Sequence, residues 1–247
     1  MKSMHFAVCD STQKIDNKPS KKKDDVQSKT KVEFDNLTTN AEPLEQDQHG
    51  VKVYRLPNEK ILKLFWRRNK ISSQIWAPHA QRFARNALIL KNRHIPTIDV
   101  ESIFKLPHLK CDAVLYHELP GTTLRSWLRA HSGNDQQDKI QQFGQFVSRL
   151  HDKGIHFRSL HLGNVLVTPN GSFALIDIVD MTFQHFGKST ISKRLRNLRH
   201  IARYKEDRQL MVSEGDNVFI DSYLEASHLS EADNKQLRSV YFQLFLT

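Results

Sequence analysis

Cysteine, long apolar runs and glycine-rich motifs are all scarce in this chain of 247 residues. Its two cysteines, Cys9 in a polar leading segment and Cys111 in what we expect to be a loop, exclude a disulfide framework and favour a reducing compartment. No uncharged run approaches the ~18 residues of a membrane-spanning helix, and residues 1–9 lack the apolar core of a signal peptide. We therefore expect a cytoplasmic protein.

Apolar residues are also few, at 38% of the chain, which is low for a domain that is folded throughout. The deficit is concentrated in residues 1–30, which are rich in Lys, Asp, Ser and Gln and show no apolar period. Such a composition cannot bury enough apolar surface to offset the entropy of ordering. We expect a disordered charged tail over residues 1–30.

Acidic residues are missing from one long stretch. None occurs between Glu59 and Asp99, where nine Lys and Arg fall, and a second basic stretch covers residues 188–208. Because residues 1–50 are nearly neutral, the formal charge of +10 belongs to the rest of the chain, which contains these two basic regions, 60–93 and 188–208. They are either solvated faces or attraction sites for a polyanion such as an anionic glycolipid or a membrane surface. No recognition motif favours nucleic acid.

Two short apolar strands are predicted at residues 165–167 and 173–176, joined by the turn residues Pro169, Asn170 and Gly171. A hairpin here would bring Asn164, just before the first strand, close to Asp177, just after the second. An amide oxygen beside a carboxylate suits Mg²⁺ that carries the phosphates of a nucleotide.

The spacing of Asn164 and Asp177, with the lead-in Leu160-His161-Leu162-Gly163, resembles the catalytic loop and metal-binding Asp of protein-kinase-like proteins. Within that fold it is most similar to the bacterial lipopolysaccharide-core kinase family, in its "toluene tolerance" branch. The resemblance implies an α+β fold: a small, mainly β lobe with one helix over residues 31–116, and a mainly α lobe over residues 117–247. A nucleotide cleft would lie between the two lobes.

The same resemblance implies roles for further residues. Lys63, on a predicted strand among apolar neighbours, matches the lysine that holds the α- and β-phosphates of ATP. His117 and Leu119 match the linker whose backbone meets adenine. Mg²⁺ would be held by Asn164 and Asp177, and the acceptor would be a hydroxyl of lipopolysaccharide core or a related glycolipid. The protein would then work at the inner face of the inner membrane.

Two parts of the kinase pattern are absent. Ser159 stands where these enzymes place the Asp that accepts the proton of the substrate hydroxyl, and a neutral serine is a poor base. The helix predicted over residues 78–90 has no acidic residue to orient Lys63, although Gln81 or Asn86 could hydrogen-bond it. These departures leave two interpretations open: a slow or atypical ATP-dependent kinase, and a pseudokinase that binds a nucleotide or a partner.

Two neighbouring side chains leave further roles open. Asp180 could be a second metal ligand or a substitute base, and His161 could accept a proton or stabilise the loop, of which we favour the loop role.

Overall fold

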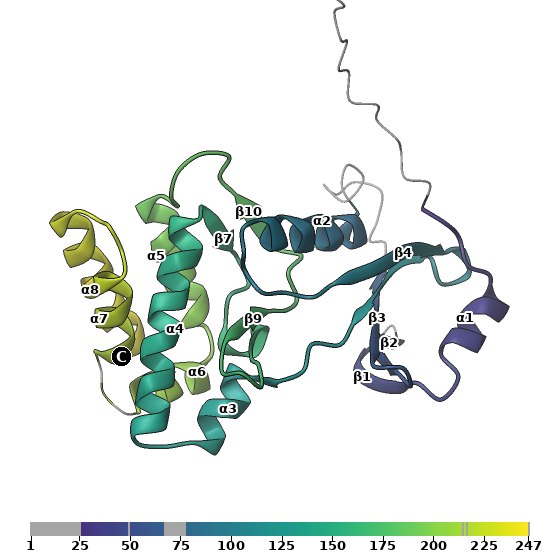
Figure 1. Cartoon of the computed structure of the whole chain (residues 1–247), viewed down its shortest axis with the longest axis horizontal. Helices are drawn as coiled ribbons and strands as arrows, with labels where there is room; N and C mark the ends of the chain where they lie inside the picture. The colour runs from purple at the N-terminus through teal and green to yellow at the C-terminus, as the bar shows by residue number, and fades with distance from the viewer. Residues whose placement is uncertain (1–25, 49, 67–77, 214, 216, 247) are drawn as a thin grey trace, which may run out of the picture.

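A computed structural model describes residues 26–48, 50–66, 78–213, 215 and 217–246 of the chain. The protein is α+β: a five-stranded antiparallel sheet forms the N-terminal part, and helices dominate the C-terminal part (Figure 1). This confirms the expected division into a mainly β part followed by a mainly α part. None of the helices among these residues is long and apolar enough to cross a bilayer.

The N-terminal part has sheet order β1-β2-β3-β5-β4. Its elements are α1 (Lys31–Leu37), β1 (Glu42–Asp47), β2 (Gly50–Leu56), β3 (Lys60–Trp66), α2 (His79–Asn92), β4 (Val100–Leu106), the short helix η2 (Pro107–Leu109) and β5 (Cys111–His117). The hairpin of β2 and β3 follows from alternating apolar residues on both sides of a Pro-Asn-Glu turn. Its register pairs Val53 with Lys63 and Leu56 with Lys60.

Two predictions for this part need correction. The last residues of the expected tail, 26–30, are structured, since Ser28 bridges to β4 and Thr30 caps α1 by accepting a hydrogen bond from the Glu33 N–H. Residues 1–25, including Cys9, lie outside the described residues. Cys111 is not in a loop but at the start of β5, fully buried, because the strand begins earlier than its apolar run suggests.

The C-terminal part begins beyond β5. Its elements are β6 (Thr122–Thr123), α3 (Leu124–Ala130), α4 (Asn134–Asp152), β7 (Ile155–Phe157), the short helix η3 (Leu162–Asn164), β8 (Val165–Val167), β9 (Phe173–Leu175), β10 (Met181–Phe183), α5 (Ile191–Ile201), α6 (Lys205–Val212), α7 (Val218–Glu225) and α8 (Glu231–Phe245). The apolar stripe of α4, which includes Ile140, Phe143 and Val147, is buried as its helical spacing predicts. Gly144 lets α7 approach closely, because a Cβ there would lie 2.1 Å from Ser222 Oγ.

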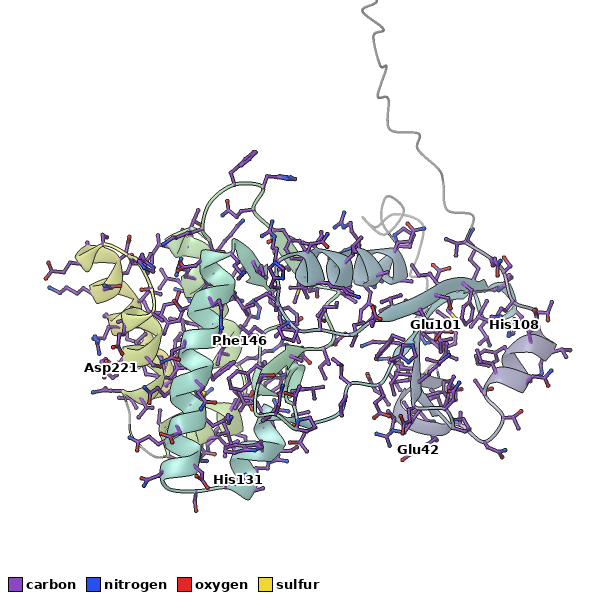
Figure 2. The ribbon with its side chains drawn as sticks, in the orientation of Figure 1. Glu42, Glu101, His108, His131, Phe146 and Asp221 are labelled. Atoms are coloured by element: carbon purple, nitrogen blue, oxygen red, sulfur yellow. The ribbon has the colours of Figure 1, made fainter. Side chains whose placement is uncertain are left out.

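Helix α2 connects the two parts. Its buried face, which includes Ala80, Phe83 and Leu90, belongs to the large core of the C-terminal helices rather than to the small core under the sheet. Figure 1 shows α2 between the sheet and the bundle. Figure 2 places Glu42 and Glu101 on the sheet and Asp221 at the far end of the helical part. Helix α2 therefore contacts strands β3, β4 and β5 of the sheet while its apolar face belongs to the large core.

A polar network is buried inside the helical part. The ring of His151 is fully buried between the hydroxyl of Tyr223, 2.8 Å from Nδ1, and Asn197 Oδ1, 2.9 Å from Nε2. A neutral ring protonated at Nε2 satisfies both, donating to Asn197 and accepting from Tyr223, whose oxygen also accepts from Arg194. Burial lowers the pKa of His151 to about 3, so the neutral ring persists in the folded protein far below neutral pH.

This network predicts acid sensitivity. In the unfolded chain His151 takes up a proton near its ordinary pKa of about 6.5, whereas the folded protein does not until about pH 3. The contribution to stability is therefore complete above pH 6.5 and falls as the pH falls below it, by about 2 kcal/mol between pH 7 and pH 5. Urea unfolding at these two pH values should show a smaller pH dependence in His151→Gln than in the wild type. His185→Gln, at an exposed histidine, is the control, and equal pH dependence in all three proteins would contradict the assignment.

Candidate functional site

The hairpin of β8 and β9 brings together Asn164 and Asp177, the two residues expected to hold a metal ion. Val165 pairs with Leu175, and the Ile176 N–H donates to the Asn164 carbonyl at 3.1 Å. The turn is stabilised by Asn170, whose side-chain oxygen accepts from the Ser172 N–H, as expected for an Asx-type turn. Asn164 and Asp177 therefore flank one end of the same hairpin, as their positions in the sequence predict.

Lys63 of β3 reaches this end of the hairpin from the sheet. Its Nζ lies 2.6 Å from Asp177 Oδ1, although the two residues are 114 positions apart. The lysine side chain is only 14% exposed and its ammonium lies within 6 Å of the rings of Phe65 and Phe83. Aromatic faces and a carboxylate together compensate for the desolvated charge. Lys63 therefore points inward, toward the residues with which the sequence associates it.

Asp177 has an unusual backbone. Its φ of +52° lies in the left-handed region, which costs a residue other than glycine about 1 kcal/mol but is tolerated best by Asn and Asp. Its carboxylate remains about half exposed while it contacts Lys63. The chain thus turns sharply at this residue and presents its acid to the side from which Lys63 approaches.

Asn164 is oriented by the loop before it. Its amide nitrogen donates to the Ser159 carbonyl at 2.8 Å, so Oδ1 is the side-chain atom that would bind a cation. Mg²⁺ usually takes one or two protein oxygens and completes its shell with phosphate and water. Among the described residues there is no cluster of three or more His, Cys, Asp and Glu suited to a metal. The donors present at the hairpin fit a magnesium–nucleotide complex.

The side chain of His161 supports the same loop. Its Nδ1 accepts a hydrogen bond from the Gly163 N–H at 3.0 Å, and its ring meets Tyr204 edge-on. Burial, followed by the charge of Arg125, lowers the pKa of His161, so the ring is neutral at physiological pH. Because its accepting nitrogen is occupied within the loop, the geometry favours the structural role of His161.

Helix α2 does not bind Lys63 through an amide. Asn86 instead donates to the carbonyls of Ile178 and Val179, at 2.7 and 3.1 Å, and Gln81 is exposed. Arg82 pairs with Asp180 at 3.4 Å. The suggested contact of Gln81 or Asn86 with the lysine is therefore wrong, because the buried face of α2 packs against the segment that follows Asp177.

The linker after β5 offers less free backbone than expected. The His117 N–H donates to the Asp99 carbonyl at 3.2 Å, and the Glu118 N–H donates to the Glu59 carbonyl at 2.9 Å. Leu119 packs against the large core. The N–H group of His117 is thus already paired within the protein, and the assignment of the backbone of His117 and Leu119 to adenine stays a prediction.

A buried carboxylate that sequence reasoning missed holds the loop in place. Asp207 of α6 is fully buried and accepts from Arg125 Nε at 2.6 Å, from Arg125 Nη2 at 3.0 Å and from the Leu162 N–H at 3.1 Å. In sequence it is one acid within a basic stretch, with nothing local to mark it as buried. Because it ties α3 and α6 to η3, it fixes the loop that carries Ser159 and Asn164.

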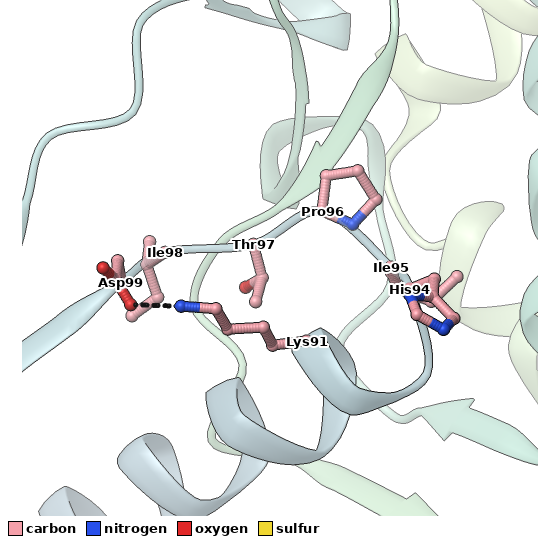
Figure 3. A pocket seen from close by; sticks show the side chains of 7 residues that line it. All are labelled: Lys91, His94, Ile95, Pro96, Thr97, Ile98 and Asp99. Atoms are coloured by element: carbon pink, nitrogen blue, oxygen red, sulfur yellow. Dashed lines mark hydrogen bonds and ion pairs between the residues drawn. The ribbon is translucent and has the colours of Figure 1, made fainter.

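A separate hollow of about 320 Å³ lies where α2 runs into β4 (Figure 3). It is lined by Lys91, His94, Ile95, Pro96, Thr97, Ile98 and Asp99. Its one ion pair joins Lys91 to Asp99 at 3.1 Å, and both side chains are largely exposed. None of the residues discussed above as metal or nucleotide ligands lines it, so it adds nothing to that site.

Comparison with known proteins adds no assignment. No protein-family model matches the chain, and no curated protein matches it. The resemblance to lipopolysaccharide-core kinases therefore stays a prediction from the loop residues.

The burial of Asp207 generates a stability prediction. Asp207→Asn keeps the shape but leaves Arg125 without a counter-charge in a site that is only partly exposed, so we expect a loss of about 3 kcal/mol. The adjacent Glu206 pairs with Arg129 at the surface, where Glu206→Gln should cost less than about 1 kcal/mol. Denaturant unfolding of both variants measures the difference, and equal losses would show that Asp207 is not the anchor of the loop.

Proposed function

We propose that this protein is a kinase-like phosphotransferase that moves the γ-phosphoryl group of ATP to a hydroxyl of lipopolysaccharide core or a related glycolipid. The observation that carries the proposal is the 2.6 Å contact between Lys63 and Asp177, which joins the sheet to the hairpin end. A cation, an acid and an amide oxygen gathered between a β part and a helical part suit a magnesium–triphosphate. A two-lobed protein-kinase-like fold, with α2 between the lobes, is part of this proposal.

Each residue then has a distinct task. Lys63 would exchange its contact with Asp177 for the α- and β-phosphates, and Asn164 and Asp177 would hold Mg²⁺, which neutralises charge on the transferring group. The acceptor oxygen would bond to the γ-phosphorus as the bond to the leaving ADP oxygen breaks. Ser159 would lie beside the acceptor, since its carbonyl is tied to the Asn164 amide.

The missing base predicts a slow enzyme rather than an inactive one. Phosphoryl transfer depends mainly on positioning and charge neutralisation, and general-base assistance typically contributes a further factor of about 10²–10⁴. Without a carboxylate at residue 159, the proton of the acceptor hydroxyl would pass to water or to a phosphate oxygen.

A second candidate function is nucleotide or partner binding without transfer, as in a pseudokinase. The observation that favours it is the role of α2, whose Asn86 and Arg82 hold residues 178–180 instead of orienting Lys63. In that case the Lys63–Asp177 contact would serve mainly to hold the two parts together.

Nucleotide binding is the first test. At ten times its dissociation constant, ATP with Mg²⁺ should stabilise the protein by about 1.4 kcal/mol and raise Tm by about 3–6 °C. Asp177→Asn, which tolerates the same left-handed backbone, should abolish the rise. Asp221→Asn makes the same change at an exposed acid paired with Arg238 and should retain it. If millimolar nucleotide did not raise the Tm of the wild type, ATP-dependent transfer and nucleotide binding would both be excluded.

Transfer is the second test. Ser159→Asp restores a base at the required position and should raise phosphotransfer to purified lipopolysaccharide core by about 10²-fold or more. Ser159→Asn has the same shape without basicity and should leave the rate near that of the wild type. A nucleotide-induced rise in Tm with no turnover in any of these proteins would favour the pseudokinase, and equal rates for Asp and Asn would mean that residue 159 does not face the acceptor.

A further inference from the structure

The two basic regions differ in how the fold neutralises them. In the first, most of the described cations have a carboxylate partner from outside the region. The pairs are Lys60 with Glu101 at 2.7 Å, Lys63 with Asp177 at 2.6 Å, Arg82 with Asp180 at 3.4 Å and Lys91 with Asp99 at 3.1 Å. Arg67, Arg68 and Lys70 lie outside the described residues. The described part of region 60–93 is therefore largely neutralised within the protein, which weakens its assignment as an attraction site.

The second region retains more of its charge, although Lys188 and Arg194 both pair with Asp152. Its two acids, Glu206 and Asp207, are taken up by Arg129 and Arg125 of α3, outside the region. Lys193 and Arg196 of α5 have no carboxylate partner among the described residues. The fold thus removes the local counter-ions of α5 and leaves its outward cations available.

These cations face a groove between α5 and the strand pair of β7 and β10. The groove encloses about 510 Å³ and is lined by His156, Arg158, Thr182, Ser192, Lys193 and Arg196. Three cations and two hydroxyls are gathered there, and no carboxylate is among the lining residues. Guanidinium and ammonium groups beside hydroxyl donors form the side-chain set that binds the oxygens of a phosphate group.

His156 adds an independent sign of a ligand. Its side chain is buried, at 3% exposure, and its Nε2 has no hydrogen-bond partner among the described residues, while Nδ1 lies 3.3 Å from Thr182 Oγ1. Burial, with the charges of Lys193 and Arg196, lowers the pKa of this ring to about 4, so it is neutral at physiological pH. A buried polar nitrogen without a partner is costly, and if the ring turned so that Nε2–H reached the groove, a phosphate oxygen that accepted from it would relieve that cost.

We propose that this groove binds a phosphomonoester group, held by Arg158, Lys193 and Arg196 with His156 as an additional donor. A compact dianion matches a concave site with few cations, whereas nucleic acid would require a longer basic track. Arg158 directly precedes Ser159, and the main-chain N–H of Arg158 donates to the Asp180 carbonyl at 2.8 Å. The groove therefore adjoins the proposed transfer site, and a phosphate already present on the acceptor would orient its free hydroxyl. The binding itself does not depend on the proposed function.

Calorimetric titration with inorganic phosphate and with glucose 6-phosphate tests the site. Both should bind the wild type, and unphosphorylated glucose should not. Arg196→Gln should weaken binding at least tenfold, whereas Arg199→Gln, the same change on the same helix but outside the groove, should alter it less than twofold. No binding of either probe, or equal weakening by the two variants, would overturn the proposal in favour of a diffuse basic surface.

The Tm of the unliganded protein distinguishes a ligand-binding role of Arg196 from a structural one. Because Arg158, Lys193 and Arg196 repel one another, Arg196→Gln should leave the Tm of the unliganded protein unchanged or higher. A fall in Tm would mean that Arg196 supports the fold instead of a ligand. His156→Phe keeps a ring in place but removes both nitrogens, and unchanged phosphate affinity in this variant would remove His156 from the site.

Binding to lipid vesicles shows whether the phosphate group that the groove binds belongs to a lipid or to a soluble molecule. Phosphatidylcholine vesicles that contain phosphatidic acid present a phosphomonoester, and vesicles with phosphatidylglycerol at matched surface charge present only a diester. Preference for phosphatidic acid, lost in Arg196→Gln, would indicate a lipid-borne group, and binding of glucose 6-phosphate alone would indicate a soluble one. If the protein bound both kinds of vesicle equally and Arg196→Gln did not reduce that binding, the proposal would be overturned.

The two proposals can fail separately. Asp177→Asn should retain phosphate binding, and Arg196→Gln should retain the rise in Tm with ATP and Mg²⁺. Loss of phosphate binding in Asp177→Asn would place the anion at the hairpin end and overturn the assignment to the groove.

Discussion

Residues 176–180 are held from four directions, and most of the site depends on that restraint. The Ile176 N–H donates to the Asn164 carbonyl, Lys63 contacts Asp177, Asn86 donates to the carbonyls of Ile178 and Val179, and the Asp180 carbonyl accepts from the Arg158 N–H. The four partners come from η3, the sheet, α2 and the residue that follows β7. Because each is anchored in a different element, the left-handed turn at Asp177 is fixed where an isolated hairpin would relax.

The same segment explains how α2 can lack an acid. A helix that approaches a buried lysine would usually supply a counter-charge, but here Asp177 supplies it from the other side. The buried face of α2 is then free to satisfy main-chain carbonyls, which a neutral amide does without the cost of a buried charge. Asp207 has the corresponding role below the loop, where one carboxylate satisfies Arg125 and the Leu162 N–H together. Its burial is sustained by these charge-assisted hydrogen bonds.

Sequence reasoning was accurate where the signal is local. The apolar neighbours of Lys63 on its strand predicted an inward lysine, and the turn at residues 169–171 predicted the hairpin. It was wrong about Cys111, about residues 26–30 and about the partners of Asn86 and Gln81. The partners of Asp207 and Asn86 could not be predicted, since they lie tens of residues away and neither residue belongs to a local pattern.

The sequence by itself determined the succession of strands and helices, because period, turn residues and caps act over a few neighbouring positions. It also determined which residues are chemically able to bind a cation and a phosphate. Only the tertiary structure decided which charges remain available. The described part of region 60–93 is largely neutralised by distant acids, whereas the acids of α6 pair with α3, and Lys193 and Arg196 have no carboxylate partner among the residues that the structure describes. The reason is that screening and desolvation depend on distance and burial in space, and separation along the chain does not fix either.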